Sequence, residues 1–124
     1  MEDLKQKLMK KHLLAPGHTA CAGCGEALGM RLIVDAIGPN CIIANATGCS
    51  EIFTSKYPQS AWEVPWVHSL FENSSAIASG VEVALKARGK TGIKVVAMGG
   101  DGATADIGIG CISGMWERGH NILY

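Results

Sequence analysis

Two groups of residues in this chain have the types and spacing that chemistry requires. Cys21 and Cys24 are separated by two residues, and a third cysteine follows at Cys49. Thiolates at such spacing can hold a soft metal ion or an iron–sulfur cluster, for which four cysteines are the usual ligand set. The same spacing occurs in thioredoxin-like redox pairs and in zinc sites, so these alternatives stay open for this group.

The second group is a glycine-rich loop, Gly99-Gly100-Asp101-Gly102, which directly follows an apolar run. Glycines let backbone N–H groups approach a phosphate, and a helix that starts there adds its positive end. A carboxylate would repel phosphate unless a cation lay between them, which makes Asp101 a candidate magnesium ligand. The alternative is that Asp101 only caps the helix, and the dinucleotide-binding spacing G-x-G-x-x-G is absent.

The other two cysteines are weaker candidates for a metal site. Cys41 begins the apolar run that Cys49 follows, which would place the two roughly 20 Å apart in an extended strand. Cys111 lies within a predicted helix among small apolar residues, where a packed thiol is expected. A fourth ligand is therefore missing from the sequence and is expected downstream or from another subunit.

Helices alternate with short apolar strands along the chain. The hydrophobic pattern predicts helices over residues 2–13, 25–37, 72–88 and 105–118, and strands over 41–46, 93–98 and 120–124. We expect an α/β fold with a parallel sheet and helices on both faces. In such sheets ligands bind beyond the carboxyl ends of the strands, so Cys49 and Asp101 should open on the same edge.

Two segments carry more specific expectations. The helix at 72–88 should bury a face made of Ile77, Val81, Ala84 and Leu85. Residues 47–70 read as a long irregular loop, of a length that is usually functional or covered by a partner. Its aromatic residues Trp62, Trp66 and His68 are expected to pack the loop down, the alternative being that they form part of a substrate or subunit interface.

Composition excludes several classes of function. The chain has 124 residues with 11 basic and 11 acidic side chains, so its formal charge is zero and nothing indicates a nucleic-acid partner. The sequence has no apolar run long enough for a membrane span and no signal-peptide core, and a cytoplasmic location is expected. Because the sequence ends as a strand begins, we expect residues 1–124 to be the N-terminal part of a single, truncated domain.

Three stretches together resemble a known family. Gly17 to Glu26, Thr47 to Ser50, and Gly100 to Gly102 with its flanks occur in the order and context seen in 2-oxoacid:ferredoxin oxidoreductases. The chain is similar to the β subunit, or thiamine-diphosphate domain, of the pyruvate:ferredoxin members. The resemblance covers nearly the whole sequence and implies the diphosphate-binding half of a thiamine-diphosphate fold.

The resemblance implies a role for individual residues. Cys21, Cys24 and Cys49 would ligate a 4Fe-4S cluster, and Asp101 would bind Mg²⁺. The cofactor-binding positions would be Glu26, Cys49, Gly100, Asp101, Gly102, Ala103 and Thr104, with the last two along the diphosphate. No catalytic residue is assigned, because the family's activating glutamate comes from the other half of the enzyme.

The implied reaction is the oxidative decarboxylation of pyruvate to acetyl-CoA and CO₂, with electrons passing through the cluster to ferredoxin. Coenzyme A, an α subunit and other subunits would be the partners, and the chain alone should be inactive. The fourth cluster ligand and the second half of the thiamine motif are expected beyond Tyr124. Alternatives are another 2-oxoacid substrate, branched-chain or 2-oxoglutarate, or a C-x-x-C redox or metal module without thiamine.

Overall fold

Four parallel strands form the centre of the molecule. The computed structural model describes residues 11–56, 58 and 60–124, so the helix predicted at 2–13 lies largely outside the described residues. The strands are β1 (Cys41–Asn45), β2 (Trp66–His68), β3 (Lys94–Met98) and β4 (Ile122–Leu123). Their order is β2-β1-β3-β4, and every neighbouring pair is parallel. The predicted parallel α/β sheet is confirmed.

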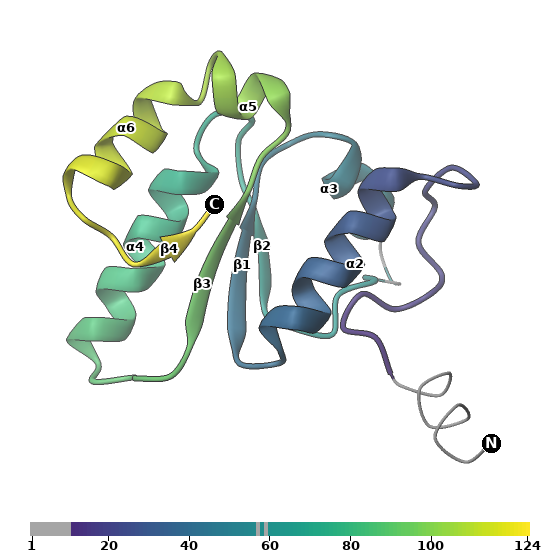
Figure 1. Ribbon diagram of the computed structural model, residues 1–124, viewed down its shortest axis with the longest axis horizontal. Helices are drawn as coiled ribbons and strands as arrows, with labels where there is room; N and C mark the ends of the chain where they lie inside the picture. Colours follow the sequence, from purple (N-terminus) through teal and green to yellow (C-terminus); the bar gives the residue numbers. More distant parts are fainter. Residues whose placement is uncertain (1–10, 57, 59) are drawn as a thin grey trace.

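Helices cover both faces of this sheet (Figure 1). One face carries α2 (Gly25–Ile37) and α3 (Cys49–Thr54), and the other carries α4 (Ser74–Ala87) and α6 (Ile109–Glu117). Each face has its own apolar cluster. The larger cluster, beside α2, includes Leu14, Val34, Ile43, Phe53 and Trp62, and the smaller, beside α4, includes Ala44, Ala78, Val95 and Ala97. Two separately packed layers thus hold the sheet from both sides.

The α2 helix matches its predicted range because its end is fixed by local chemistry. Gly38 follows Ile37 with a φ of 88°, a left-handed conformation that a side chain would disfavour. Its N–H donates to the Val34 carbonyl at 2.9 Å, which satisfies one of the last carbonyls of the helix. The helix therefore stops where β1 can begin.

The α4 helix buries a more polar face than its sequence predicts. Ile77, Val81 and Leu85 pack against the smaller cluster as expected, but Ala84 is exposed. The buried positions on α4 are Ser74, Ser75, Ala78, Ser79 and Glu82. Small side chains are needed there because α4 lies between the sheet and α6 (Figure 1), and both must approach it closely.

Lys86 and His120 pair with the buried Glu82 side chain on that face. Its carboxylate accepts hydrogen bonds from Lys86 Nζ at 2.5 Å and from His120 Nδ1 at 3.0 Å. These two partners, Lys86 first, hold the pKa of Glu82 below its usual range. Arg118 Nε donates to His120 Nε2 at 3.3 Å, so His120 joins the turn before β4 to the side of α4.

The helix predicted over 105–118 is present only from Ile109 to Glu117, as α6, and a separate short helix precedes it. The chain forms α5 (Asp101–Ala105), turns, and resumes as α6. Gly108 makes this break possible, because a Cβ there would overlap the carbonyl oxygen of Ala103 and lie 2.7 Å from its carbonyl carbon. The irregular segment predicted at 47–70 also contains two regular elements, α3 and β2, which are only six and three residues long.

Candidate functional site

Three strands end at the same level, and the candidate residues follow directly. Asn45, the last residue of β1, is paired with His68 of β2 and with Met98 of β3. The helix α3 begins at Cys49 just past β1, and α5 begins at Asp101 just past β3. The expectation that Cys49 and Asp101 open on one edge of the sheet is confirmed.

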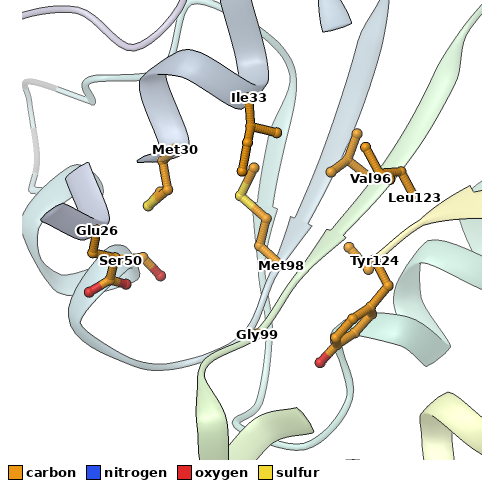
Figure 2. A pocket seen from close by; sticks show the side chains of 10 residues that line it. Glu26, Met30, Ile33, Ser50, Val96, Met98, Gly99, Leu123 and Tyr124 are labelled. Atoms are coloured by element: carbon orange, nitrogen blue, oxygen red, sulfur yellow. The ribbon is translucent and has the colours of Figure 1, made fainter. Parts of the chain in front are cut away.

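A largely apolar cavity of about 430 Å³ lies beside this edge. Figure 2 shows Glu26 and Ser50 at one end of it, Met98 in the middle, and Leu123 and Tyr124 at the other end. The remaining lining residues are Met30, Ile33, Val96, Ala97 and Gly99. Glu26, from the first turn of α2, is therefore brought to the same region as the loop that precedes Asp101.

The glycine–aspartate loop leaves its carboxylate free. Gly100 occupies the N-cap of α5 in an extended conformation, and Asp101 is the first helical residue, with no side-chain capping bond. Within the described residues the exposed Asp101 side chain makes no hydrogen bond or ion pair. The alternative reading of Asp101 as a helix cap is thus wrong, and its oxygens remain available to a cation.

The rest of the loop is packed tightly against its neighbours. A Cβ on Gly102 would lie 2.7 Å from Cζ of Phe71, so the backbone rests on that ring. Ala103 is buried beneath the loop, and Thr104 donates its hydroxyl proton to the Gly100 carbonyl at 2.6 Å. In contrast, a Cβ on Gly100 would meet no atom within 4 Å. The loop is supported from below and open at Gly100.

The three candidate cysteines lie at the starts of two helices. Cys24 is the N-cap of α2, and its N–H donates to the Cys21 carbonyl in a tight turn. The N–H of Thr19 donates to the Phe53 carbonyl, which ties the segment before Cys21 to the helix that Cys49 begins. All three thiols are free, with Cys21 and Cys49 exposed and Cys24 half-buried.

These cysteines are not gathered into a metal site in the described part of the chain. No group of three or more His, Cys, Asp or Glu side chains there could hold a metal ion. Cys41 is buried, and burial raises the pKa of its thiol, which suits a packed side chain rather than a thiolate ligand. Cys111 lies half-buried in α6. Cys21, Cys24 and Cys49 therefore offer donor atoms of the type that a metal site needs, but their thiols are not arranged around a common point.

Sequence reasoning missed a hydrogen-bonded group at the ends of β1 and β2. Thr47 donates its hydroxyl proton to the Ser69 carbonyl at 3.1 Å, so it accepts from His68 Nε2 at 2.9 Å. Glu51 Oε2 lies 4.0 Å from the same nitrogen. His68 is the last residue of β2, and a residue at the end of a parallel strand is a candidate site residue. Because β2 was not among the predicted strands, this position could not be recognised from the sequence.

The aromatic residues of the 47–70 segment pack together as expected. The Trp62 and Trp66 rings stack with centroids 6.3 Å apart, and Trp66 stacks on His68 at 6.1 Å. Trp62 is buried in the larger cluster. This stack supports the edge of the sheet beneath His68.

Residues 46–124 match the family described as thiamine pyrophosphate enzyme, C-terminal TPP binding domain. The chain belongs to this family. The match begins at the end of β1 and includes the whole glycine–aspartate loop, so the open Gly100 and the free Asp101 lie in a segment that the family shares.

Individual relatives agree with this assignment. The chain is 53% identical to pyruvate synthase subunit PorB of Methanothermobacter marburgensis, over 95% of this chain and 41% of that protein. It is 48% identical to the same subunit of Pyrococcus furiosus, over 97% and 39%. It is 44% identical to ketoisovalerate oxidoreductase subunit VorB of Pyrococcus abyssi, over 99% and 42%. The chain thus spans about two fifths of the length of these relatives.

The residues present fit one of the two groups that the sequence led us to expect. The free Asp101 carboxylate beside the unobstructed Gly100 backbone suits a magnesium–diphosphate group. The ungathered thiols suit an iron–sulfur cluster in donor type only. No helix within the described ranges is long and apolar enough to cross a bilayer.

Proposed function

We propose that this chain is the cofactor-binding part of the β subunit of a 2-oxoacid:ferredoxin oxidoreductase acting on pyruvate. The observation that carries the proposal is the Asp101 carboxylate, free at the start of α5 and beside the open Gly100. Its support is the family match and the similarity to pyruvate synthase subunits. The products would be acetyl-CoA and CO₂, with coenzyme A as co-substrate and ferredoxin as electron acceptor.

Each residue of the loop would have a separate task. Asp101 would bind Mg²⁺, a cation that prefers carboxylate and phosphate oxygens as ligands. Gly100 and Gly102 would let the backbone approach the diphosphate, and Ala103, whose side chain is buried, would contact it through the backbone. The hydroxyl of Thr104 is already bonded within the loop and would shape it.

The end of the cavity lined by Glu26 and Ser50 would face the reacting part of the cofactor. Bound thiamine diphosphate supplies the carbon nucleophile for decarboxylation of a 2-oxoacid. Glu26 and the Cys49–Ser50 segment would line its site, while Met30, Ile33 and Met98 would exclude water from it. Cys21, Cys24 and Cys49 would ligate a 4Fe-4S cluster together with a further cysteine.

The proposal is tested by purifying the protein without oxygen, together with any subunits that associate with it. Thiamine diphosphate, magnesium, iron and sulfide should all be present, and pyruvate with coenzyme A should reduce ferredoxin. Zinc in place of iron, or a reversible dithiol with no thiamine diphosphate, would instead support a C-x-x-C module.

A second substrate class has a specific observation in its favour. The relative from Pyrococcus abyssi is named for ketoisovalerate, a branched-chain 2-oxoacid, and matches 99% of this chain. Comparing the ratio of kcat to KM for pyruvate, 3-methyl-2-oxobutanoate and 2-oxoglutarate decides between the substrates. We expect pyruvate to give the highest ratio, and a higher ratio for either of the others would overturn that choice.

A further inference from the structure

The side chain of Tyr124 reaches back onto the glycine–aspartate loop. Its hydroxyl lies 2.9 Å from Thr104 Oγ1 and 3.4 Å from the Ala103 carbonyl oxygen. Figure 2 shows the Tyr124 ring beside Gly99, at the end of the cavity opposite Glu26. One side chain thus contacts both the beginning and the end of the loop.

The direction of the hydrogen bonds is fixed by counting protons. Thr104 has a single hydroxyl proton, and it points to the Gly100 carbonyl at 2.6 Å. Thr104 Oγ1 must then accept, and the Tyr124 hydroxyl donates to it at 2.9 Å in preference to the Ala103 carbonyl oxygen at 3.4 Å. These two hydrogen bonds run from Tyr124 through Thr104 to Gly100. They connect the residue after β4 to the N-cap of α5.

Gly99 is fitted to this contact. A Cβ on Gly99 would overlap the Tyr124 hydroxyl, and the next nearest atoms would be Ala103 Cβ at 3.2 Å and Tyr124 Cζ at 3.3 Å. Since the φ of Gly99 is not in the left-handed region, the backbone conformation does not itself require glycine. The requirement comes from the close approach of the hydroxyl.

We propose that Tyr124 is a positioning residue for the diphosphate loop. It holds the Thr104 hydroxyl on the Gly100 carbonyl and so keeps Gly99 to Thr104 in the conformation that presents Gly100 and Asp101. Tyr124 acts through Thr104 and Gly100 rather than on the cofactor. This inference rests on the proposed function, because it assigns the loop to thiamine diphosphate.

The first test removes only the hydroxyl. In Tyr124→Phe, the affinity of cofactor-free protein for thiamine diphosphate with Mg²⁺, measured by titration calorimetry, should fall about fivefold, the effect of one hydrogen bond. In the enzyme assembled with its other subunits, KM for thiamine diphosphate should rise equally, while kcat at saturation stays unchanged. Ser79→Ala is the control, because it also removes one side-chain hydroxyl that donates a hydrogen bond, to the Ser75 carbonyl at 2.7 Å in α4, and should leave the affinity unchanged.

A double-mutant cycle then tests the contact itself. Gly99→Ala should displace the Tyr124 hydroxyl and also weaken cofactor binding about fivefold. The double variant should lose much less than the sum of the two single losses, since the overlapping hydroxyl is gone and only the contacts with Ala103 Cβ and the ring Cζ remain. Wild-type affinity in Tyr124→Phe, or additive losses in the double variant, would overturn the inference. A wild-type protein that binds no thiamine diphosphate would overturn the proposed function and this inference with it.

Discussion

The cysteine segment and the glycine–aspartate loop share one edge of the sheet but are held in different ways. The loop is fixed by the protein's own atoms, with Phe71 under Gly102, Tyr124 against Gly99 and Ala103 against Gly108. Cys21 and Cys49 are exposed, and the three thiols form no metal-holding group among the described residues. The diphosphate loop is therefore formed in advance, whereas a cluster would itself have to draw its ligands together.

The sharpest way to break this comparison is to remove one thiol. Cys24→Ser should strongly lower the iron and sulfide content, because it removes one of the four expected thiolate ligands. Thiamine diphosphate binding should persist, since the loop does not depend on the thiols. Iron and sulfide analysis with cofactor titration measures both. Cys111→Ser, in α6, is the control and should retain full iron, and an equal iron loss there would refute the ligand assignment.

The most destabilising substitution near the loop is expected at Gly108, in the turn between α5 and α6. In Gly108→Ala, the new methyl group would meet the Ala103 carbonyl and the Glu72 carbonyl oxygen, the latter at 3.1 Å, and backbone atoms cannot move aside cheaply. We expect the free energy of unfolding to fall by about 3 kcal/mol in urea titrations. In Gly110→Ala the Cβ meets nothing within 4 Å, so this control should be neutral or stabilising. Similar losses in both variants would contradict the packing argument.

A substitution that keeps the loop's shape sharpens the comparison further. Asp101→Asn should lower the affinity for thiamine diphosphate at fixed Mg²⁺ at least about tenfold without changing the melting temperature of cofactor-free protein. Asp106→Asn removes the same charge from another exposed carboxylate nearby and should have no effect. If the two variants weakened binding equally, the effect would be one of net charge and not of metal ligation.

The smallest expected effect is on acid stability and concerns Glu82, on the sheet face that α4 covers. Because Lys86 and His120 lower the pKa of Glu82, the stability from its carboxylate is present above the unfolded-state pKa of about 4.3 and is lost as pH falls toward the lower folded value. Glu82→Gln should flatten the dependence of melting temperature on pH below about 5. An unchanged slope would show that other carboxylates set the acid stability. The substitution should leave cofactor affinity at pH 7 unchanged.

Sequence patterns predicted the long elements and the shared edge well. Residues 25–37 and the strands starting at Cys41 and near Lys94 have a clear period or apolar run, and the turn at Gly38 fixes a boundary. Parallel strands then required Cys49 and Asp101 to open together. These outcomes depend on local preference and on a general rule of α/β topology, both of which can be read from a single chain.

The rest depended on contacts between distant residues. The six residues of α3 and the three of β2 are too short to show a period, so the Thr47–His68 pair could not be foreseen. Ala84 was predicted to be buried but is exposed. The buried face of α4 is instead made largely of small polar side chains, because α6 packs closely on that helix. The break at Gly108 and the approach of Tyr124 to Gly99 are tertiary contacts that no local pattern records.

The pairing of β1 with β3 also sets the order in which the chain can assemble. Cys41 is partnered with Lys94 and Asn45 with Met98, so the central ladder joins segments separated by the whole of α3, β2 and α4. Bringing such distant segments together loses loop entropy before any contact compensates for it, and this slows folding. During synthesis, β1 must wait on the ribosome for β3 to emerge. Because α2 precedes β1 in the chain and packs against it, α2 is the first helix that can cover the apolar residues of β1.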